Sequence, residues 1–177
     1  MFKVFILALA TIVLLAAPAT AAKIGETAAP SKKSEVKLAP LLDDNSIANL
    51  KDGFRGMPWG SKKSDMKALE FTDCKQMDQL VENCNAEKST LKLDDAPLVH
   101  IRYKFVDDAF FGIALKFETK YAEKVQALVY KELGQPSEFK DRIPQWKTEV
   151  FTAWLSSTHF SIDAKKPLEE AIAKRKK

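Results

Sequence analysis

The strongest constraint on the fold comes from two consecutive stretches in which large apolar side chains occupy every second position. In the first stretch, residues 99–105, the alternate positions carry polar or charged side chains, namely His100, Arg102 and Lys104. The second stretch covers residues 111–117 and follows the Asp107–Asp108 pair. A period of two places successive side chains on opposite faces of a β-strand. The pattern therefore predicts an antiparallel hairpin with one buried face and a turn at the two aspartates.

Helical spacing of apolar residues follows directly after this hairpin. Residues 122–133 carry it, with Thr119 as the expected N-cap and with Gly134 and then Pro136 as the stop. A final helix is expected to begin at Pro167, because proline suits the first turn of a helix. This second helix has only a narrow apolar stripe, so we expect it to pack loosely.

Strand patterns also occur on both sides of these elements. Residues 148–155 and 159–163 are rich in aromatic and β-branched residues and flank a polar turn, which predicts a second hairpin. Residues 54–60 read as an extended segment with a glycine-bounded turn, followed by a short helix that Ser61 or Ser64 would cap. Together these elements predict an α+β domain. We expect an antiparallel β-sheet of roughly four to six strands with two or three helices packed on one face.

The first 22 residues have the features of a cleaved export signal. Lys3 supplies a positive start, residues 5–17 are apolar and uncharged, and small residues precede a cut after Ala21 or Ala22. The apolar run is shorter than the roughly 20 residues that a membrane-spanning helix needs. We therefore predict a periplasmic protein, with secretion as the alternative, and no transmembrane span after cleavage.

Composition divides the remaining chain into two parts. Residues 23–45 contain few large apolar side chains and two prolines, so they are predicted to be a flexible leader. Residues 46–177 are long enough to bury a core and are predicted to form a single domain. The formal net charge of +4 is too small to define a nucleic-acid-binding surface, and an exported protein does not normally meet nucleic acid.

The chain has two cysteines, Cys74 and Cys84, both in the predicted domain. In an oxidising compartment such a pair favours a disulfide. The spacing matches neither a redox motif nor covalent haem attachment, and no histidine lies near enough in sequence for a zinc site. The residues between the cysteines are compatible with a short pair of strands or with an irregular loop.

No catalytic, cofactor or metal signature stands out in the sequence. His100 lies on the polar side of its strand and is interpreted as solvent-facing. His159 follows Ser156-Ser157-Thr158, but a nucleophilic serine also needs an oriented base and an oxyanion hole, and the strained glycine-flanked turn that serves this purpose in many hydrolases is missing. The pairs Asp94–Asp95 and Asp107–Asp108 lie in expected turns, where aspartate bonds local backbone amides. We therefore expect no enzyme activity, no cofactor and no metal, and keep an envelope hydrolase as the least favoured alternative.

One segment resembles a known group of proteins. Phe54-Arg55-Gly56-x-x-Trp59-Gly60 before a short helix, together with Leu133-Gly134-Gln135-Pro136 after a second helix, resembles small exported bacterial proteins of unknown function. The order of helix, Gly-x-Pro and antiparallel strands is similar, more distantly, to the envelope domains of BamE and of beta-lactamase inhibitor protein. The chain departs from BamE because it has no lipid-attachment cysteine. The resemblance implies an α+β fold and an envelope location, and it transfers no catalytic residue.

Most aromatic residues are expected in the core, and two are candidates for a binding patch. Phe110 is out of phase with the apolar alternation of its strand, and Trp146 lies in a polar segment after Pro144. If both side chains are exposed, they would offer a surface to a partner. The basic end of the chain, residues 174–177, is interpreted as a solvated helix terminus that complements the helix dipole.

The sequence therefore favours a non-catalytic periplasmic binding or protein-interaction module. Its partner would be an envelope protein or a small apolar ligand. The alternatives are an exported inhibitor of an enzyme such as a lysozyme or protease, and a carrier of an apolar ligand. The oligomeric state is left open.

Overall fold

The computed structural model describes residues 47–87 and 89–176, which lie in one unit of the chain. The predicted signal peptide and leader, residues 1–45, lie outside the described residues. The strands are β1 (Gly53–Phe54), β2 (Met57–Pro58), β3 (Phe71–Gln76), β4 (Val81–Ala86), β5 (Lys92–Leu93), β6 (Ala96–Val106), β7 (Ala109–Phe117), β8 (Glu138–Lys140), β9 (Ile143–Lys147), β10 (Phe151–Leu155) and β11 (His159–Ala164). The helices are η1 (Lys63–Leu69), η2 (Thr119–Tyr121), α1 (Ala122–Leu133) and α2 (Lys165–Arg175).

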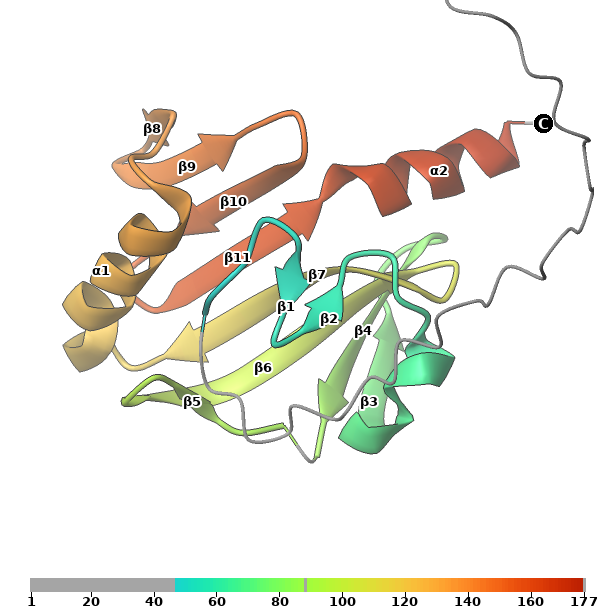
Figure 1. Ribbon diagram of the computed structural model, residues 1–177, viewed down its shortest axis with the longest axis horizontal. Coiled ribbons are helices and arrows are strands. Elements are labelled where there is room, and N and C mark those ends of the chain that lie inside the picture. Colours follow the sequence, from blue (N-terminus) through green and yellow to red (C-terminus); the bar gives the residue numbers. More distant parts are fainter. Residues whose placement is uncertain (1–46, 88, 177) are drawn as a thin grey trace, which may run out of the picture. The chain divides into compact units, whose positions relative to one another are not determined.

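One large antiparallel sheet organises the fold (Figure 1). Its strand order is β3-β4-β6-β7-β11-β10-β9-β8, and β5 pairs in addition with β6. The sheet has nine strands, more than the four to six expected, whereas the α+β class is confirmed. The difference arises because short strands such as β5 and β8 leave little pattern in the sequence. No helix in residues 47–87 and 89–176 combines the length and apolarity needed to cross a membrane.

Both predicted hairpins are present. β6 and β7 meet at a turn in which Asp107 and Asp108 have φ values of 47° and 68°. Left-handed conformations at both turn residues match the twist of a tight hairpin, and aspartate tolerates them. β10 and β11 form the second hairpin, whose register runs from Phe151 opposite Ala164 to Leu155 opposite Phe160.

The helix predicted at residues 122–133 is α1, and Gly134 ends it with a φ of 80°. Its N-terminus differs from the prediction. Thr119 does not cap α1, because Thr119–Tyr121 forms a turn of 3₁₀ helix and Tyr121 occupies the N-cap position without a side-chain hydrogen bond. The 3₁₀ turn leads the backbone into the helix in place of a side-chain cap.

The other two helices also begin differently from expectation. η1 is a 3₁₀ helix with Lys62 at its N-cap, and neither Ser61 nor Ser64 caps it. α2 begins at Lys165, so Pro167 is its third residue. Proline is still tolerated there, because backbone N–H groups in the first turn have no partner within the helix.

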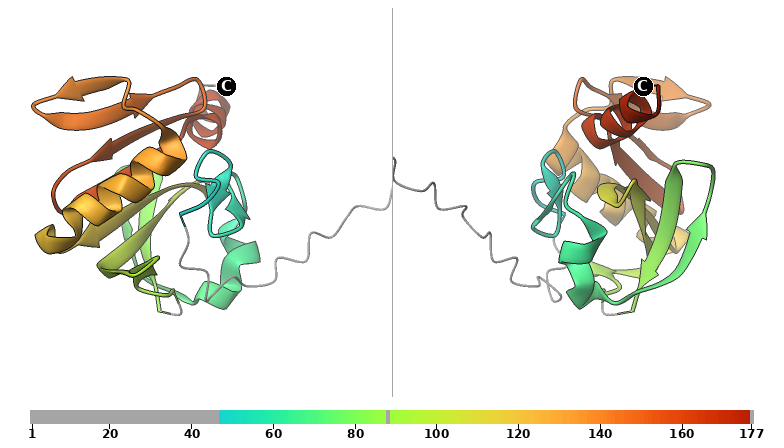
Figure 2. Two further views of the ribbon diagram at one scale, coloured as in Figure 1. Left: turned by 60° about the vertical axis from the view of Figure 1, so that its left-hand side comes forward. Right: turned by 90° about the vertical axis from the view of Figure 1, so that its right-hand side faces the viewer.

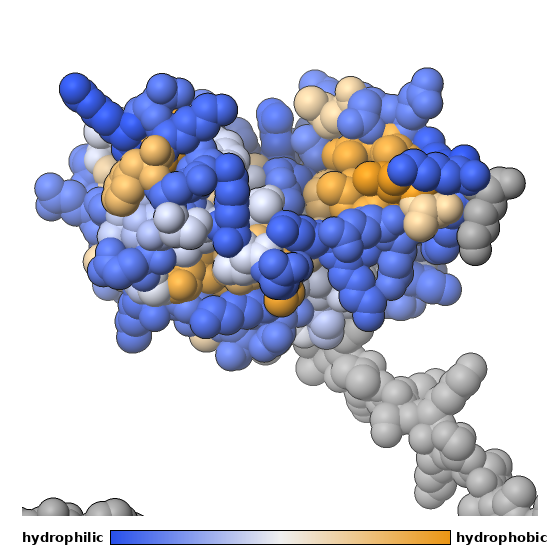
Figure 3. Space-filling model, turned by 90° about the horizontal axis from the view of Figure 1, so that it is seen from above, coloured by the Kyte–Doolittle hydropathy of each residue, from blue (hydrophilic) through white to orange (hydrophobic). Residues whose placement is uncertain are grey.

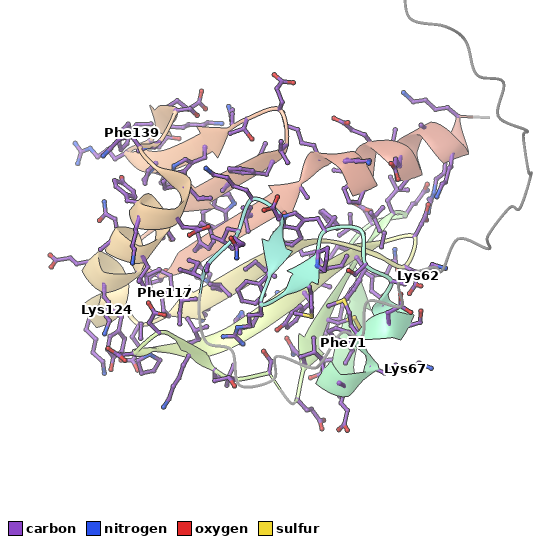
Figure 4. All side chains as sticks on the ribbon, in the orientation of Figure 1. Lys62, Lys67, Phe71, Phe117, Lys124 and Phe139 are labelled. Carbon is purple, nitrogen blue, oxygen red and sulfur yellow. A yellow bond between two sulfur atoms is a disulfide. The ribbon has the colours of Figure 1, made fainter. Side chains whose placement is uncertain are left out.

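The main core lies on one face of the sheet. Side chains of β6, β7, β11 and β10 on this face pack against β1, β2, η1 and α1, which Figure 2 shows on the same side of the curved sheet. Figure 4 shows Phe71 and Phe117 turned toward this interior, whereas Lys67 of η1 and Lys124 of α1 extend outward. Burial of aromatic rings dominates the cluster: Phe54, Tyr103, Phe105, Phe110, Phe117 and Phe160 are at most 1% exposed.

α2 packs against the opposite face. It joins a separate cluster in which Ala171 and Leu168 contact Val106 and Phe111. The helices therefore do not all cover one face, contrary to expectation. β11 stops pairing with β7 at Gly112, and three backbone hydrogen bonds join residues 60–63 to residues 108–110 at the start of β7.

The two outer strands of the sheet are irregular or short. β3 has a break in its pairing with β4 between Thr72 and Lys75, and Asp73 in this break has a φ of 46°. β8 is only three residues long, and all three are exposed. Short or bulged edge strands pair poorly with strands of other chains.

Candidate functional site

The predicted binding patch of Phe110 and Trp146 is absent, because both side chains are buried. Phe110 is 0% exposed and packs on Trp59 with ring centroids 4.8 Å apart. The register of β6 and β7 shifts beside Phe111, where Lys104 pairs with Gly112 but Phe105 pairs with Phe110. This β-bulge inserts one extra residue, so that Phe110 returns to the core face. The apolar alternation of the sequence could not show the bulge.

Trp146 is buried for a different reason. It is 2% exposed, lies edge-on to Tyr130 of α1 at 5.5 Å, and donates its indole N–H to the carbonyl oxygen of Gly134 at 3.0 Å. The hydrogen bond satisfies the one polar atom of the ring. Trp146 therefore anchors α1 to the sheet, and its polar neighbours in sequence lie on the other side of β9.

The predicted disulfide between Cys74 and Cys84 is confirmed and links β3 to β4. The intervening residues form a tight turn in which Asp78 accepts the backbone N–H groups of Leu80 and Val81. These two hydrogen bonds hold the pKa of Asp78 below its ordinary value. Glu82 lies beside the two cysteines, but the sulfur atoms are bonded to each other and are not available as thiolate ligands for a metal.

The Phe54-Arg55-Gly56 segment has a structural role. Arg55 is 3% exposed and donates to the Ser89 hydroxyl and to the carbonyl oxygens of Thr90 and Lys92. The Ser89 hydroxyl is also within 2.8 Å of the Tyr103 hydroxyl, deep in the core. Arg55 therefore holds the chain that leads into β5 against the sheet, and we assign it no chemistry.

The serine and histidine residues near the β10–β11 turn do not form a nucleophile and base. The ring nitrogen Nδ1 of His159 lies 2.8 Å from the hydroxyl oxygen of Thr158, its neighbour in sequence. Ser156 and Ser157 line a hollow whose lining does not include His159. The geometry of these residues therefore does not support the hypothesis of a serine hydrolase.

That hollow is the first of two surfaces with recognition chemistry. It has a volume of about 530 Å³ and lies between α1 and the β8–β9 hairpin, where Tyr130, Phe139, Ile143 and Leu155 supply apolar lining. Phe139 is 65% exposed, and Figure 4 shows it at the outer end of β8. Asp141 and Arg142 add polar groups at the rim.

The second surface is the face of the sheet opposite the main core, which we call the uncovered face. α2 covers this face only near Val106 and Phe111. Cross-strand pairing places His100 of β6, Lys116 of β7 and His159 of β11 in one row across three neighbouring strands. Arg102 lies two residues from His100 and points to the same face. We call these four residues the cation cluster.

The cation cluster has no acidic partner among residues 47–87 and 89–176. None of its four members belongs to an ion pair there. The pKa of His100 lies below its ordinary value, first because burial disfavours the charged ring and then because Arg102, Lys116 and His159 repel it. The cluster therefore has no direct ion pair among the described residues, and the hollow that Arg102 lines also contains Asp73.

A neighbouring lysine on the same face is paired. Lys104 binds the Asp163 carboxylate at 2.7 Å and the Ser161 hydroxyl at 2.8 Å. Its strand and that of Asp163 are separated by β7, where the intervening residue is Gly112. Because glycine has no side chain, the two partners meet across it. The Lys104–Asp163 pair lies next to the cation cluster, and neither of its members forms an ion pair with a residue of the cluster.

Trp154 gives the uncovered face an aromatic group. It is 40% exposed and pairs with Ser161 of β11, two residues from His159. Diagonal neighbours on adjacent strands lie roughly 7 Å apart, within reach of large side chains. A partly exposed indole therefore lies beside a row of basic side chains that form no ion pair within the described residues.

An exposed apolar area also lies over α2. Figure 3 shows it among hydrophilic side chains on the side of the molecule where α2 lies in Figure 1. Ile172 is 36% exposed there, and Leu168 packs half-buried against the small cluster beneath α2. Ile172 and Leu168 both belong to α2, so this apolar area is part of the surface of that helix.

Sequence reasoning did not find the cation cluster. The polar alternates His100, Arg102 and Lys104 were visible, and His100 was correctly placed on the polar side of its strand. Their meeting with Lys116 and His159 depends on the pairing of β7 with β11, which are separated in the chain by α1 and three strands.

Comparison with known proteins adds no family assignment. No family model, no curated protein and no solved structure matches this chain. The roles given above therefore rest on the geometry of the structure.

Proposed function

We propose that the chain is a non-catalytic binding module of the periplasm that holds its partner on the uncovered face of its sheet. The observation that carries this proposal is the exposed Trp154 beside four basic side chains without acidic partners. Exposed aromatic and arginine side chains are enriched in binding surfaces, whereas unpaired like charges on one face lower the stability of a fold. A partner that neutralises them would offset that cost.

Two further features support an exported binding module. The Cys74–Cys84 disulfide suits an oxidising compartment, and the N-terminal sequence has the features of an export signal. The sequence resemblance to small exported bacterial proteins agrees with this location and remains a prediction.

The direct test is saturable binding to an envelope extract with a matched pair of variants. Trp154→Ala removes the exposed ring of the uncovered face, and Phe139→Ala removes an exposed ring on β8. We expect Trp154→Ala to weaken partner binding at least about tenfold and Phe139→Ala to leave it unchanged. Equal binding by the wild type and Trp154→Ala contradicts the proposal. A measurable turnover without any partner also contradicts it.

A second candidate function is that of an apolar-ligand carrier, favoured by the hollow beside Phe139. Its volume of about 530 Å³ and its aromatic and aliphatic lining suit a small apolar molecule. Native mass spectrometry of the purified protein would then show a bound ligand that Phe139→Ala loses and Trp154→Ala retains. The opposite pattern excludes the carrier.

The enzyme-inhibitor alternative is a special case of partner binding. It predicts that added protein lowers the residual activity of a lysozyme or protease, and that Trp154→Ala restores the activity. Undiminished activity at saturating protein excludes inhibition of the enzyme tested.

A further inference from the structure

The position of the cation cluster limits the kind of partner that can reach it. β6, β7 and β11 are interior strands of the sheet, and Lys116 lies where β7 pairs with both β6 and β11. Side chains point away from the two faces of a sheet, whereas strand addition takes place at a sheet edge. A ligand of this surface has to interact with side chains alone.

The side chains present a linear arrangement of charge. Neighbouring strands lie about 4.8 Å apart, so the backbones of His100 and His159 are about 10 Å apart with Lys116 between them. Arg102 lies beside this row and is exposed, while His100, Lys116 and His159 are half-buried. Half-buried basic side chains spread along a row favour a ligand that lies flat on the sheet and brings anionic groups to several positions.

Trp154 adds a requirement for an apolar surface. Trp154 is a diagonal cross-strand neighbour of His159 on the same face and is 40% exposed, so a flat ligand that spans the row can extend to the indole. A sugar ring combines an apolar face of C–H groups, which packs on an aromatic ring, with a carboxylate at its edge. A membrane surface fits less well, because peripheral insertion needs several projecting apolar side chains and this row offers a single indole.

We propose that the cation cluster and Trp154 form a binding site for an acidic polysaccharide whose carboxylates pair with Arg102, Lys116, His100 and His159. This inference rests on the proposed function, since it assigns the ligand class of the uncovered face. Each ion pair would be a charge-assisted hydrogen bond, and the sugar ring would pack on the indole. Binding would neutralise the repulsion within the cluster.

The experiment uses polygalacturonate as the probe and isothermal titration calorimetry at low salt. Neutral dextran and poly-glutamate are the comparison polymers. We expect saturable binding of polygalacturonate, none of dextran, and binding of poly-glutamate at least about tenfold weaker, because the peptide lacks a ring for Trp154 to contact. Poly-glutamate binding as tight as that of polygalacturonate overturns the polysaccharide assignment.

Variants separate the site from the general charge of the protein. Lys116→Gln and Trp154→Ala are each expected to weaken polygalacturonate binding about tenfold. Lys67→Gln is the matched control, because Lys67 is an exposed lysine that extends from η1, on the other side of the sheet (Figure 4). Equal losses in Lys116→Gln and Lys67→Gln overturn the proposal. Circular dichroism on each variant establishes that the fold is intact before binding is compared.

Acid pH supplies a second readout. His100 is repelled by Arg102 on its own strand, by Lys116 on β7 and by His159 on β11, so bound carboxylates favour its protonated form. The affinity of the wild type for polygalacturonate is expected to rise several-fold from pH 7.5 to pH 5.5, because the carboxylates of the polymer stay ionised over this range. His100→Gln is expected to show a smaller rise. An affinity independent of pH overturns the role of the histidines.

Failure of this inference is distinguishable from failure of the proposed function. If polygalacturonate does not bind but Trp154→Ala still loses a partner from envelope extract, the polysaccharide assignment is wrong and the binding function stands. If neither polygalacturonate nor extract shows a Trp154-dependent interaction, both are wrong.

Discussion

Substitution of Gly112 by alanine tests whether the Lys104–Asp163 ion pair on the uncovered face requires a residue without a side chain between the two partners. Gly112 pairs with Lys104 on one side and with Asp163 on the other. A Cβ atom at residue 112 would collide with the carboxylate of Asp163 and would lie 2.7 Å from the carbonyl oxygen of Ile162. The carboxylate can rotate away, but the carbonyl oxygen belongs to a paired strand and can move only if the backbone shifts.

The expected cost has two parts. Forcing an extra methyl group against a sheet backbone costs about 1–3 kcal/mol. Loss of the Lys104–Asp163 ion pair, whose side chains are 16% and 33% exposed, adds about 0.5–1 kcal/mol. We therefore expect Gly112→Ala to lower the free energy of unfolding by about 1.5–4 kcal/mol.

Equilibrium urea unfolding, followed by tryptophan fluorescence and circular dichroism, measures this change. Asp163→Ala alone should cost about 1 kcal/mol or less, because it removes the ion pair without crowding the strand. Gly112→Ala in the Asp163→Ala background should still cost at least about 1 kcal/mol, since the clash with the Ile162 carbonyl remains. A Gly112→Ala variant within about 0.5 kcal/mol of the wild type refutes the reasoning.

Three further perturbations have defined outcomes. Arg55→Met removes the hydrogen bonds from the buried guanidinium to the Ser89 hydroxyl and to the carbonyl oxygens of Thr90 and Lys92, so the free energy of unfolding should fall by about 1–3 kcal/mol in urea titrations; a change of less than about 0.5 kcal/mol contradicts the structural role of Arg55. Replacing Cys74 and Cys84 by serine should cost about 2–3 kcal/mol while the sheet signal in circular dichroism persists. The pKa of His100 in the folded protein is below its ordinary value of 6.5, so just below pH 6.5 the unfolded chain binds more protons than the folded protein. The stability of the fold should therefore decrease as the pH falls below 6.5, and it should decrease less steeply in His100→Gln. Thermal melts at pH 7.5 and pH 5.5 measure both changes.

Local patterns predicted those elements whose residues are close in sequence. The period of two at residues 99–117 gave the β6–β7 hairpin, the helical spacing at residues 122–133 gave α1, and the pair of cysteines gave the disulfide. In each case the relevant contacts join residues within one hairpin, one helix or one short loop. Hydrophobic periodicity reports directly on such contacts.

Features that depend on non-local contacts were not predicted. The bulge beside Phe111 reversed the expected exposure of Phe110, and the contact with Tyr130 and Gly134 buried Trp146 within a polar stretch. α2 packs on the opposite face through contacts of Ala171 and Leu168 with Val106 and Phe111, which lie about 60 residues earlier in the chain. The pattern of a single segment contains no information about contacts between such distant segments.

The candidate site shows the same limit. His100 was placed on the polar side of its strand from the sequence, but its neighbours Lys116 and His159 come from β7 and β11. The sequence placed Trp154 in a predicted hairpin without an expectation for its exposure, and the structure shows that its side chain is 40% exposed. Knowledge of the strand order would have been needed to assemble the four cations and the indole on one surface.

The two ends of the sheet bear on how the protein behaves at high concentration. An open sheet can grow by polymerisation if an end strand accepts a strand from another copy. Here the β3 end is interrupted at Asp73 and cross-linked through Cys74, and the β8 end offers three residues only. The disulfide thus holds the longer end strand against β4 in an irregular form, so its reduction would favour fibrous assembly as well as weaken one hairpin.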